Sequence, residues 1–315
     1  MKNRGFRQTL VFSLGLLLFQ FPLWGDVPNA PSAHKPLPDP NRAALYSSLV
    51  PGWGHFYLHE DAAGWVSLLG TTGVAGLALW EQYGIWQTGS PERNTAFLLL
   101  DKVYALQFYS AYRDARVARP DLNYRHPADP APVPDLLLSP FRWDNLVSPE
   151  VWGMVLLSGG TLWAFYAGTH NQTFQSLDRV QMFGLDLARD SGAGLYGATW
   201  TSLNAFVAAG EECFFRGYWQ EEMEEDYGEL AGLTIASLTF GGLHYFNGAT
   251  TEESLEDAAF ASVLGFYLGW IYERDGYRLR RDIAAHFWWN EIQAGVGFLI
   301  DPAHNPLNVK VTFQY

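Results

Sequence analysis

Apolar residues are gathered into long segments with few charges, separated by stretches rich in arginine, proline and acidic residues. A helix that crosses a lipid bilayer needs about 20 mainly apolar residues, and this pattern predicts several. We expect them at Ala43–Leu58, Ala62–Trp80, Asn94–Tyr112, Val151–Thr169, Gly194–Ala209, Leu230–Phe246, Ala258–Tyr272 and Ile283–Ile300. The predicted fold class is therefore all-α, a polytopic helical membrane protein. Because the Asn94 segment carries Asp101 and Lys102, it could instead lie in the membrane interface as an amphipathic helix.

The N-terminus has the layout of a secretory signal. Three basic residues up to Arg7 precede an apolar run from Leu10 to Trp24, and small and polar residues follow. An uncleaved first membrane helix is the alternative. Either way, residues 1–25 carry targeting information and are no part of a soluble core.

The alternation of apolar, basic and proline-rich stretches predicts the domain organisation. We expect a signal or first helix at 1–25, an exported linker at 26–41, an N-terminal membrane-helix domain at 42–118, a Pro-rich linker at 119–149, a second membrane domain at 150–300, and a tail at 301–315. With about eight spans, both arginine clusters, at 113–125 and 274–281, fall on the cytoplasmic side. This agreement fails if the Ala43 segment does not cross. The tail Asn308–Tyr315 alternates like a strand, although a frayed end explains it equally well.

Composition supports a membrane protein. Charged residues make up only 17% of the chain, and it holds 13 Trp and 16 Tyr, the residues that gather near lipid headgroups. A large aromatic-rich soluble domain is the alternative. The net charge of −13 argues against a nucleic-acid partner. The single cysteine, Cys213, excludes an intrachain disulfide.

Four adjacent glutamate pairs occur, and one of them differs from the rest. Glu211–Glu212 follows directly on an apolar helix, and Arg216 lies one helical turn after Glu212, where the two can pair. Ionisable groups at membrane depth are costly and tend to be functional or paired. Glu211 lies roughly a quarter turn away, outside that pair. The remaining pairs resemble solvated acidic loops: Glu221–Glu222, Glu224–Glu225 and Glu252–Glu253.

Two further motifs place polar residues on apolar helices. Phe240 and His244 share one helix face, and so do His286 and Asn290. Amide hydrolysis uses such a set. A carboxylate of raised pKa takes a proton from water, a histidine orients that water or shuttles the proton, and asparagine and histidine donate hydrogen bonds to the developing oxyanion.

These motifs resemble the CPBP family of intramembrane proteases, which includes the type II CAAX prenyl proteases and bacteriocin-processing proteins. Its Glu-Glu-x-x-x-Arg, Phe-x-x-x-His and His-x-x-x-Asn motifs are intact within residues 150–300. The resemblance implies an intramembrane-protease helix bundle there. It implies Glu211, His244, His286 and Asn290 as catalytic residues, and Glu212, Arg216 and Phe240 as structural support of the site.

The resemblance also implies catalysis without a metal cofactor, although glutamate and histidine side chains could hold zinc. The expected partners are a membrane-associated protein or peptide substrate and the lipid bilayer. The expected location is a bacterial inner membrane, crossed several times. A CAAX substrate is doubtful, because protein prenylation is chiefly eukaryotic while the signal and N-terminal half look bacterial.

The N-terminal half resembles a small bacterial two-helix membrane domain with a Pro-Gly-x-Gly-x-Phe-Tyr motif, found here at Pro51–Tyr57. His55 departs from the polar residue more common there. We expect its glycines to permit a tight bend or close helix packing.

Two rival readings remain. A cysteine protease would use Cys213 with a histidine, although a small apolar filler fits that position better. A non-catalytic scaffold or an immunity-type protein would keep the motifs only to hold the fold.

Overall fold

The computed structural model describes residues 37–83, 92–167, 174–182, 185–248, 250–302 and 310–313. The predicted signal at 1–25 and most of the 26–41 linker lie outside these ranges. The described chain is mostly helical, as predicted, and its contacts divide it into two compact units. Unit 1 takes its described residues from Met1–Gly73, Val103–Val133 and Gly210–Arg278, and unit 2 takes them from Val74–Lys102, Pro134–Ala209 and Leu279–Tyr315.

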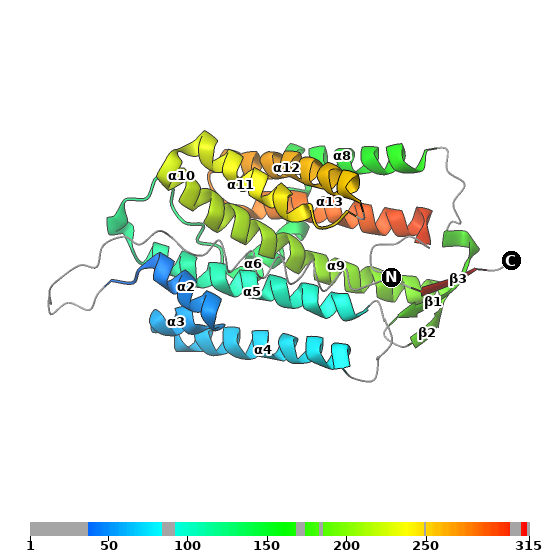
Figure 1. Ribbon diagram of the computed structural model, residues 1–315, viewed down its shortest axis with the longest axis horizontal. Helices are drawn as coiled ribbons and strands as arrows, with labels where there is room; N and C mark the ends of the chain where they lie inside the picture. Colours follow the sequence, from blue (N-terminus) through cyan, green and yellow to red (C-terminus); the bar gives the residue numbers. More distant parts are fainter. Residues whose placement is uncertain are drawn as a thin grey trace. The chain divides into compact units, whose positions relative to one another are not determined.

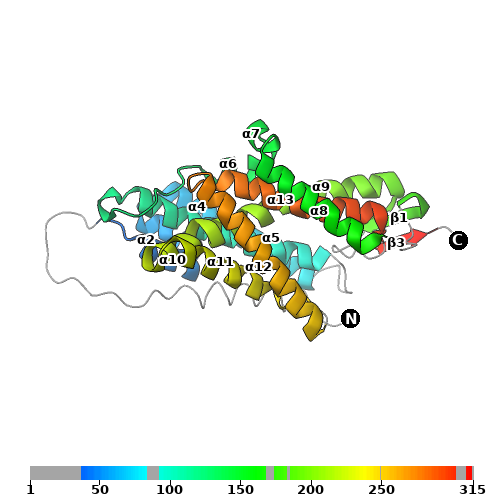
Figure 2. The ribbon, with the colours of Figure 1, turned by 90° about the horizontal axis from the view of Figure 1, so that it is seen from above.

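Unit 1 is built around two helices that lie side by side, α11 and α12 (Figure 1, Figure 2). Helix α12 begins with a capping box, in which Thr250 and Glu253 each bond the other's backbone N–H. The elements of this unit are α2 (Pro40–Leu49), α3 (Trp53–Tyr57), the first part of α4 (Asp61–Tyr83), most of α5 (Glu92–Val117), η1 (Pro120–Leu122), the end of α9 (Arg189–Phe214), the π-helical η4 (Phe215–Gln220), α10 (Glu221–Tyr227), α11 (Glu229–His244) and α12 (Thr251–Arg274).

The turn between α2 and α3 explains the glycine-rich motif. Gly52 has φ +82°, and a Cβ there would lie 2.2 Å from the carbonyl oxygen of Gly64, so no other residue fits without displacement. Gln107 of α5 holds the turn, because its side chain accepts from the Gly52 N–H and donates to the Ser47 carbonyl. The predicted bend is confirmed.

This turn also corrects one predicted membrane span. The Ala43–Leu58 segment is not a single crossing, because α2 has 10 residues and α3 has 5. At 1.5 Å per residue, α2 covers about 15 Å, half of the hydrocarbon core. The topology that placed both arginine clusters on one side therefore loses the crossing on which it depended.

Unit 2 packs α8 against α13. Helix α8 starts where Ser148 accepts from the Val151 N–H, with proline at the first helical position. The Ser158 hydroxyl then donates to the Trp289 carbonyl of α13. Besides parts of α4, α5 and α9, the elements are α6 (Val133–Leu137), η2 (Ser139–Phe141), α7 (Trp143–Leu146), α8 (Pro149–Tyr166), η3 (Phe174–Ser176), β1 (Leu177–Met182), β2 (Leu185–Ala188), α13 (Leu279–Ile300) and β3 (Lys310–Phe313).

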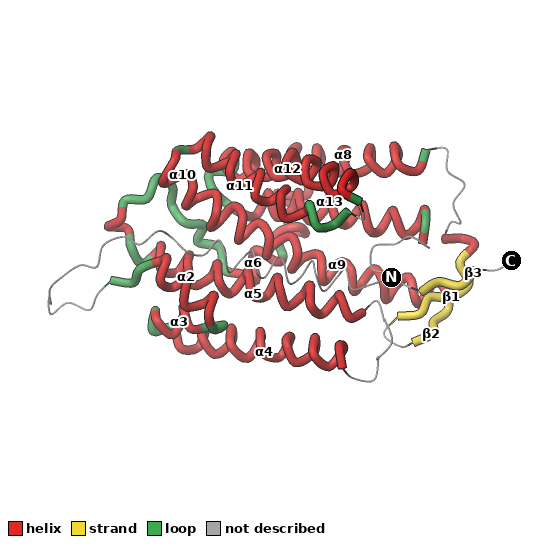
Figure 3. Tube along the Cα trace, viewed as in Figure 1, coloured by secondary structure: helices red, strands yellow, loops and turns green. Residues whose placement is uncertain are grey.

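A small sheet corrects the all-α prediction. Its antiparallel strands run in the order β2-β1-β3, drawn yellow in Figure 3. β3 lies within the tail whose alternation was strand-like, so part of the tail forms a sheet. Val180 of β1 is fully buried in a cluster with Tyr196 and Phe298. The burial of this apolar cluster gives the short strands the packing that an isolated hairpin lacks.

Within the described ranges, one helix meets the combined length, hydropathy and charge criteria for crossing a membrane, Asp61–Trp80 of α4. The predicted spans that became α5, α9, α12 and α13 are helices of 26, 26, 24 and 22 residues. Length is therefore sufficient in these four, and their polar and charged residues separate them from α4.

The contact between α11 and α12 yields a first prediction. A Cβ on Gly241 would lie 1.9 Å from the Ser262 hydroxyl and 2.4 Å from the Ala258 carbonyl oxygen. We expect Gly241→Ala to destabilise the protein by about 1–3 kcal/mol, because the helices must separate. Thermal unfolding of the purified protein measures this.

Gly242→Ala is the matched control, since a Cβ at Gly242 meets no atom of the described residues within 4 Å. It should leave the melting temperature unchanged or slightly higher, because alanine favours the helix. Equal melting temperatures for the two variants would contradict the close contact.

Candidate active site

A buried ion pair forms where α9 passes into η4. Arg216 Nε donates to Glu212 Oε2 at 3.0 Å, and both side chains are fully buried. The predicted pairing across one helical turn is confirmed. Glu211 precedes the pair and is 8% exposed, so it keeps slight access to solvent. The π-helical geometry of η4 is rare and often marks functional sites.

Phe240 and His244 of α11 lie beside this ion pair. The Arg216 guanidinium stands over the Phe240 ring, 5.5 Å from its centroid, which stabilises the buried cation. The rings of Phe240 and His244 are 4.5 Å apart. His244 Nδ1 lies 2.8 Å from the Phe240 carbonyl oxygen. A carbonyl only accepts, so Nδ1 is the donor in this contact, and in a neutral ring Nε2 would then have a lone pair for a water or substrate proton.

His286 and Asn290 lie one turn apart on α13, in unit 2. His286 is 6% exposed and Asn290 is half-buried. The backbone between them is fixed by α9, because Asn204 Nδ2 donates to the Phe287 carbonyl at 2.9 Å. Glu291 accepts from Asn204 and from the Thr201 hydroxyl.

The predicted residues therefore fall into two groups. Unit 1 holds Glu211, Glu212, Arg216, Phe240 and His244, and unit 2 holds His286 and Asn290. Sequence reasoning missed Asn204 and Glu291 as supports of the second group. The sequence did contain an indication of Asn204, because this polar residue lies two helical turns before Glu211 and therefore on the same face of α9.

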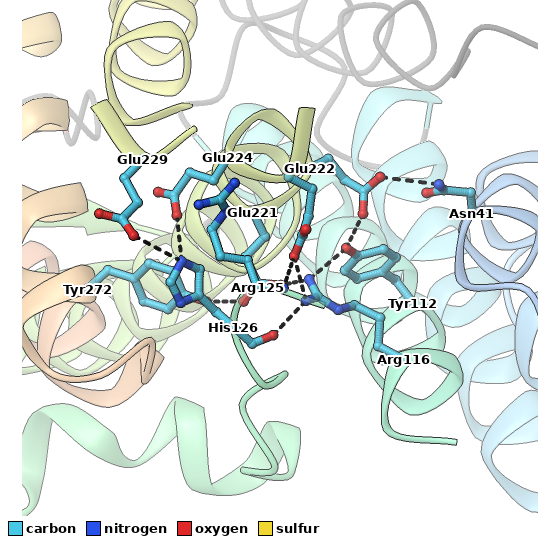
Figure 4. Close-up of polar contacts among 11 residues, drawn as sticks. Asn41, Tyr112, Arg116, Arg125, His126, Glu221, Glu222, Glu224, Glu229 and Tyr272 are labelled. Atoms are coloured by element: carbon cyan, nitrogen blue, oxygen red, sulfur yellow. Dashed lines mark hydrogen bonds and ion pairs between the residues drawn. The ribbon is translucent and has the colours of Figure 1, made fainter. Parts of the chain in front are cut away.

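A second polar cluster in unit 1 was also missed, and Figure 4 shows it. Glu221, the first residue of α10, is 3% exposed and accepts hydrogen bonds from Arg116 of α5 and from Tyr272 of α12. Glu222 accepts from Tyr112 and from Asn41. We call these residues, together with Glu224 and His126, the α5–α10 cluster.

The cluster corrects the prediction that Glu221–Glu222 and Glu224–Glu225 lie in solvated loops. The chain continues as a helix through η4 into α10, and Glu224 is fully buried. Buried carboxylates require partners, and Arg116 of the N-terminal half supplies the principal one. By contrast, Glu252 and Glu253 are exposed, as predicted, although they lie in the first turn of α12 and not in a loop.

Near the end of α12, two carboxyl groups share one neighbour. Gln220 Nε2 donates to Glu224 at 2.7 Å and to Glu273 at 3.2 Å. Burial, and then the adjacent Glu224, raise the pKa of Glu273 to about 7. Burial also raises the pKa of Glu224. One of the two carboxyl groups therefore holds a proton at a pH where a solvated glutamate is ionised.

The ion pair yields a second prediction. Glu212→Gln leaves the Arg216 guanidinium buried without a counter-charge, so we expect a loss of about 3–5 kcal/mol in the free energy of unfolding. Denaturant unfolding measures it, with Glu252→Gln as the control because that carboxylate is exposed. Glu212→Gln combined with Arg216→Met should recover much of the loss. Equal stability of Glu212→Gln and the control would contradict the role of the pair.

Glu273 yields a third prediction. Because its pKa is higher in the folded protein than the value of 4.5 expected in the unfolded chain, its contribution to stability is fully present below about pH 4.5 and is lost as the pH rises through about 7. Glu273→Gln removes this titration, so the melting temperature should fall less steeply between about pH 5 and about pH 7. Glu256→Gln, exposed on the same helix, should keep the wild-type slope. Identical slopes for Glu273→Gln and wild type would exclude the assignment.

Residues 195–292 match the family model described as Type II CAAX prenyl endopeptidase Rce1-like. All seven predicted site residues lie inside that range. No curated protein and no solved structure matches the chain. Residues 195–292 are thus an Rce1-like domain of the type II CAAX prenyl endopeptidase family, and a domain of that family implies a protease.

Proposed function

We propose that the protein is an intramembrane endopeptidase that hydrolyses peptide bonds of membrane-associated proteins or peptides. The observation that carries the proposal is the buried Glu212–Arg216 pair beside the nearly buried Glu211, inside the matched region. A fully desolvated ion pair is costly to build for packing alone. It makes sense as a fixed support for a neighbouring reactive group.

In the proposed reaction, Glu211 takes a proton from water as the water oxygen attacks the carbonyl carbon. His244, with its Nε2 lone pair, orients that water. The oxyanion accepts hydrogen bonds from His286 and Asn290. The C–N bond then breaks, and the leaving amine takes the proton from Glu211. The reaction requires that the two groups of residues act on one scissile bond.

Exposed apolar side chains support a location in the bilayer. Val66 of α4 is 73% exposed, Leu156 of α8 is 72% exposed, and Val263 of α12 is 67% exposed. Large apolar faces of this kind are unfavourable in water and suit lipid contact. We place the protein in a bacterial inner membrane as a multi-pass helical protein. Its partners are then the lipid bilayer and a peptide or protein substrate, and no nucleic acid.

The decisive test is Glu211→Gln. Membranes from cells that carry the wild-type chain should contain new peptide N-termini in membrane proteins, counted by mass spectrometry after N-terminal labelling. We expect Glu211→Gln to lower their rate of appearance by about 10²–10⁴-fold, because the base is lost. His286→Ala should lower it by about 10²–10³-fold through loss of an oxyanion donor.

Two controls accompany this test. Glu252→Gln removes an exposed carboxylate and should keep full cleavage. Cys213→Ala removes the buried thiol and should also keep it, whereas an inactive Cys213→Ala protein would favour a cysteine protease. If cellular function survives both Glu211→Gln and His286→Ala at normal protein levels, the protein acts as a scaffold or immunity-type protein.

A further inference from the structure

A second group of titratable side chains lies far from the matched region in sequence. His55 belongs to α3, Glu60 lies between α3 and α4, and Asp114 belongs to α5. One ligand-type atom of each lies within 4.8 Å of the other two. His55 is 1% exposed, whereas Glu60 is exposed and Asp114 is half-buried, so solvent reaches the group from one side.

The two oxygens of Asp114 have different neighbours. Arg113 donates to Oδ1 from Nε at 2.8 Å and from Nη2 at 2.7 Å. Oδ2 lies 3.7 Å from His55 Nε2, which is too long for a hydrogen bond. Two ligands of one tetrahedral zinc ion, each about 2.0–2.2 Å from the metal, lie about 3.4 Å apart. The spacing of Oδ2 and Nε2 is close to that value, and Arg113 does not occupy either atom.

The histidine has capacity left for a ligand. Nε2 lies 3.2 Å from the Ser110 hydroxyl, and Nδ1 is buried with no hydrogen-bond partner among the described residues. A buried polar atom without a partner is unusual and calls for an explanation such as a bound ion. Nε2 is the ring nitrogen that lies near Asp114 Oδ2, so it is the atom that would bind an ion.

The charged groups around His55 also favour a bound cation. Glu60 and Asp114 share a hydrogen bond between their side chains. Two crowded carboxylates thus face one permanent cation, Arg113. A divalent ion would relieve their mutual repulsion.

We propose that His55, Glu60 and Asp114 bind a divalent transition-metal ion, for which zinc has the best-matched chemistry. One imidazole nitrogen with two carboxylate oxygens suits zinc, whereas calcium and magnesium prefer oxygen ligands alone. Water or the Ser110 hydroxyl would complete the coordination. The ion would join the α3–α4 turn to α5, and its binding is independent of the proposed proteolysis.

The test uses the purified full-length chain, stripped with a chelator and titrated with Co²⁺ and then with Zn²⁺. We expect one visible-absorbing Co²⁺ per chain, displaced by Zn²⁺. Glu60→Gln and Asp114→Asn should each weaken binding at least tenfold, since even outer-shell changes cost about 10–100-fold. Glu60 is exposed, so its variant should fold, and thermal unfolding checks this.

Matched controls lie beside the ligands. His59→Asn and Asp61→Asn change exposed neighbours and should bind Co²⁺ as the wild type does. Glu211→Gln should also bind normally, which separates this site from the proposed protease. The proposal is overturned if the wild type binds no stoichiometric Co²⁺, or if Glu60→Gln and Asp114→Asn both bind with wild-type affinity. Tighter binding of Mg²⁺ or Ca²⁺ than of Zn²⁺ would also overturn it.

Discussion

The fully buried ion pair between Glu212 and Arg216 constrains the surrounding part of unit 1. Neither charge has water to solvate it, so each depends on the other and on the apolar groups that exclude solvent. The Phe240 ring that covers Arg216 also lies against His244, and therefore one contact chain fixes both the ion pair and the histidine. Glu211 directly precedes Glu212 on α9, so the ion pair, which fixes this end of the helix, also fixes the position of Glu211.

Buried charges also need partners in the α5–α10 cluster, and there the N-terminal half of the chain supplies them. In the α5–α10 cluster, Arg116 and Tyr112 of α5 satisfy two glutamates that directly follow η4. Without α5, those glutamates would be buried without counter-charge or would have to leave the interior. The N-terminal helices thus stabilise the segment that carries the proposed catalytic motif. We infer that the two halves of the sequence depend on each other for folding.

The helices α8, α9, α11, α12 and α13 were predictable because each carries a long apolar run. The break after α2 was not predicted as the end of a span, since it depends on the positive φ of Gly52 and on Gln107 from a distant helix. The ion pair was predictable because its partners are four residues apart. The burial of Glu221 was not, because its partner Arg116 lies 105 residues earlier in the chain. Local spacing reveals pairs within one helix, whereas pairs between helices require the tertiary fold.

The π-helical segment η4 has a consequence for helix phase. In a regular α-helix each residue turns the chain by about 100°, so Glu221 would lie about 180° round the axis from Glu212. Hydrogen bonds from i to i+5 accommodate an additional residue in the turn, and this changes the angular position about the helix axis of every later residue in the helix. Removing one residue from Phe215–Gln220 would turn α10 by about 100° and carry Glu221 away from Arg116. Across these six residues, the length of the chain is therefore constrained in addition to the identity of Arg216.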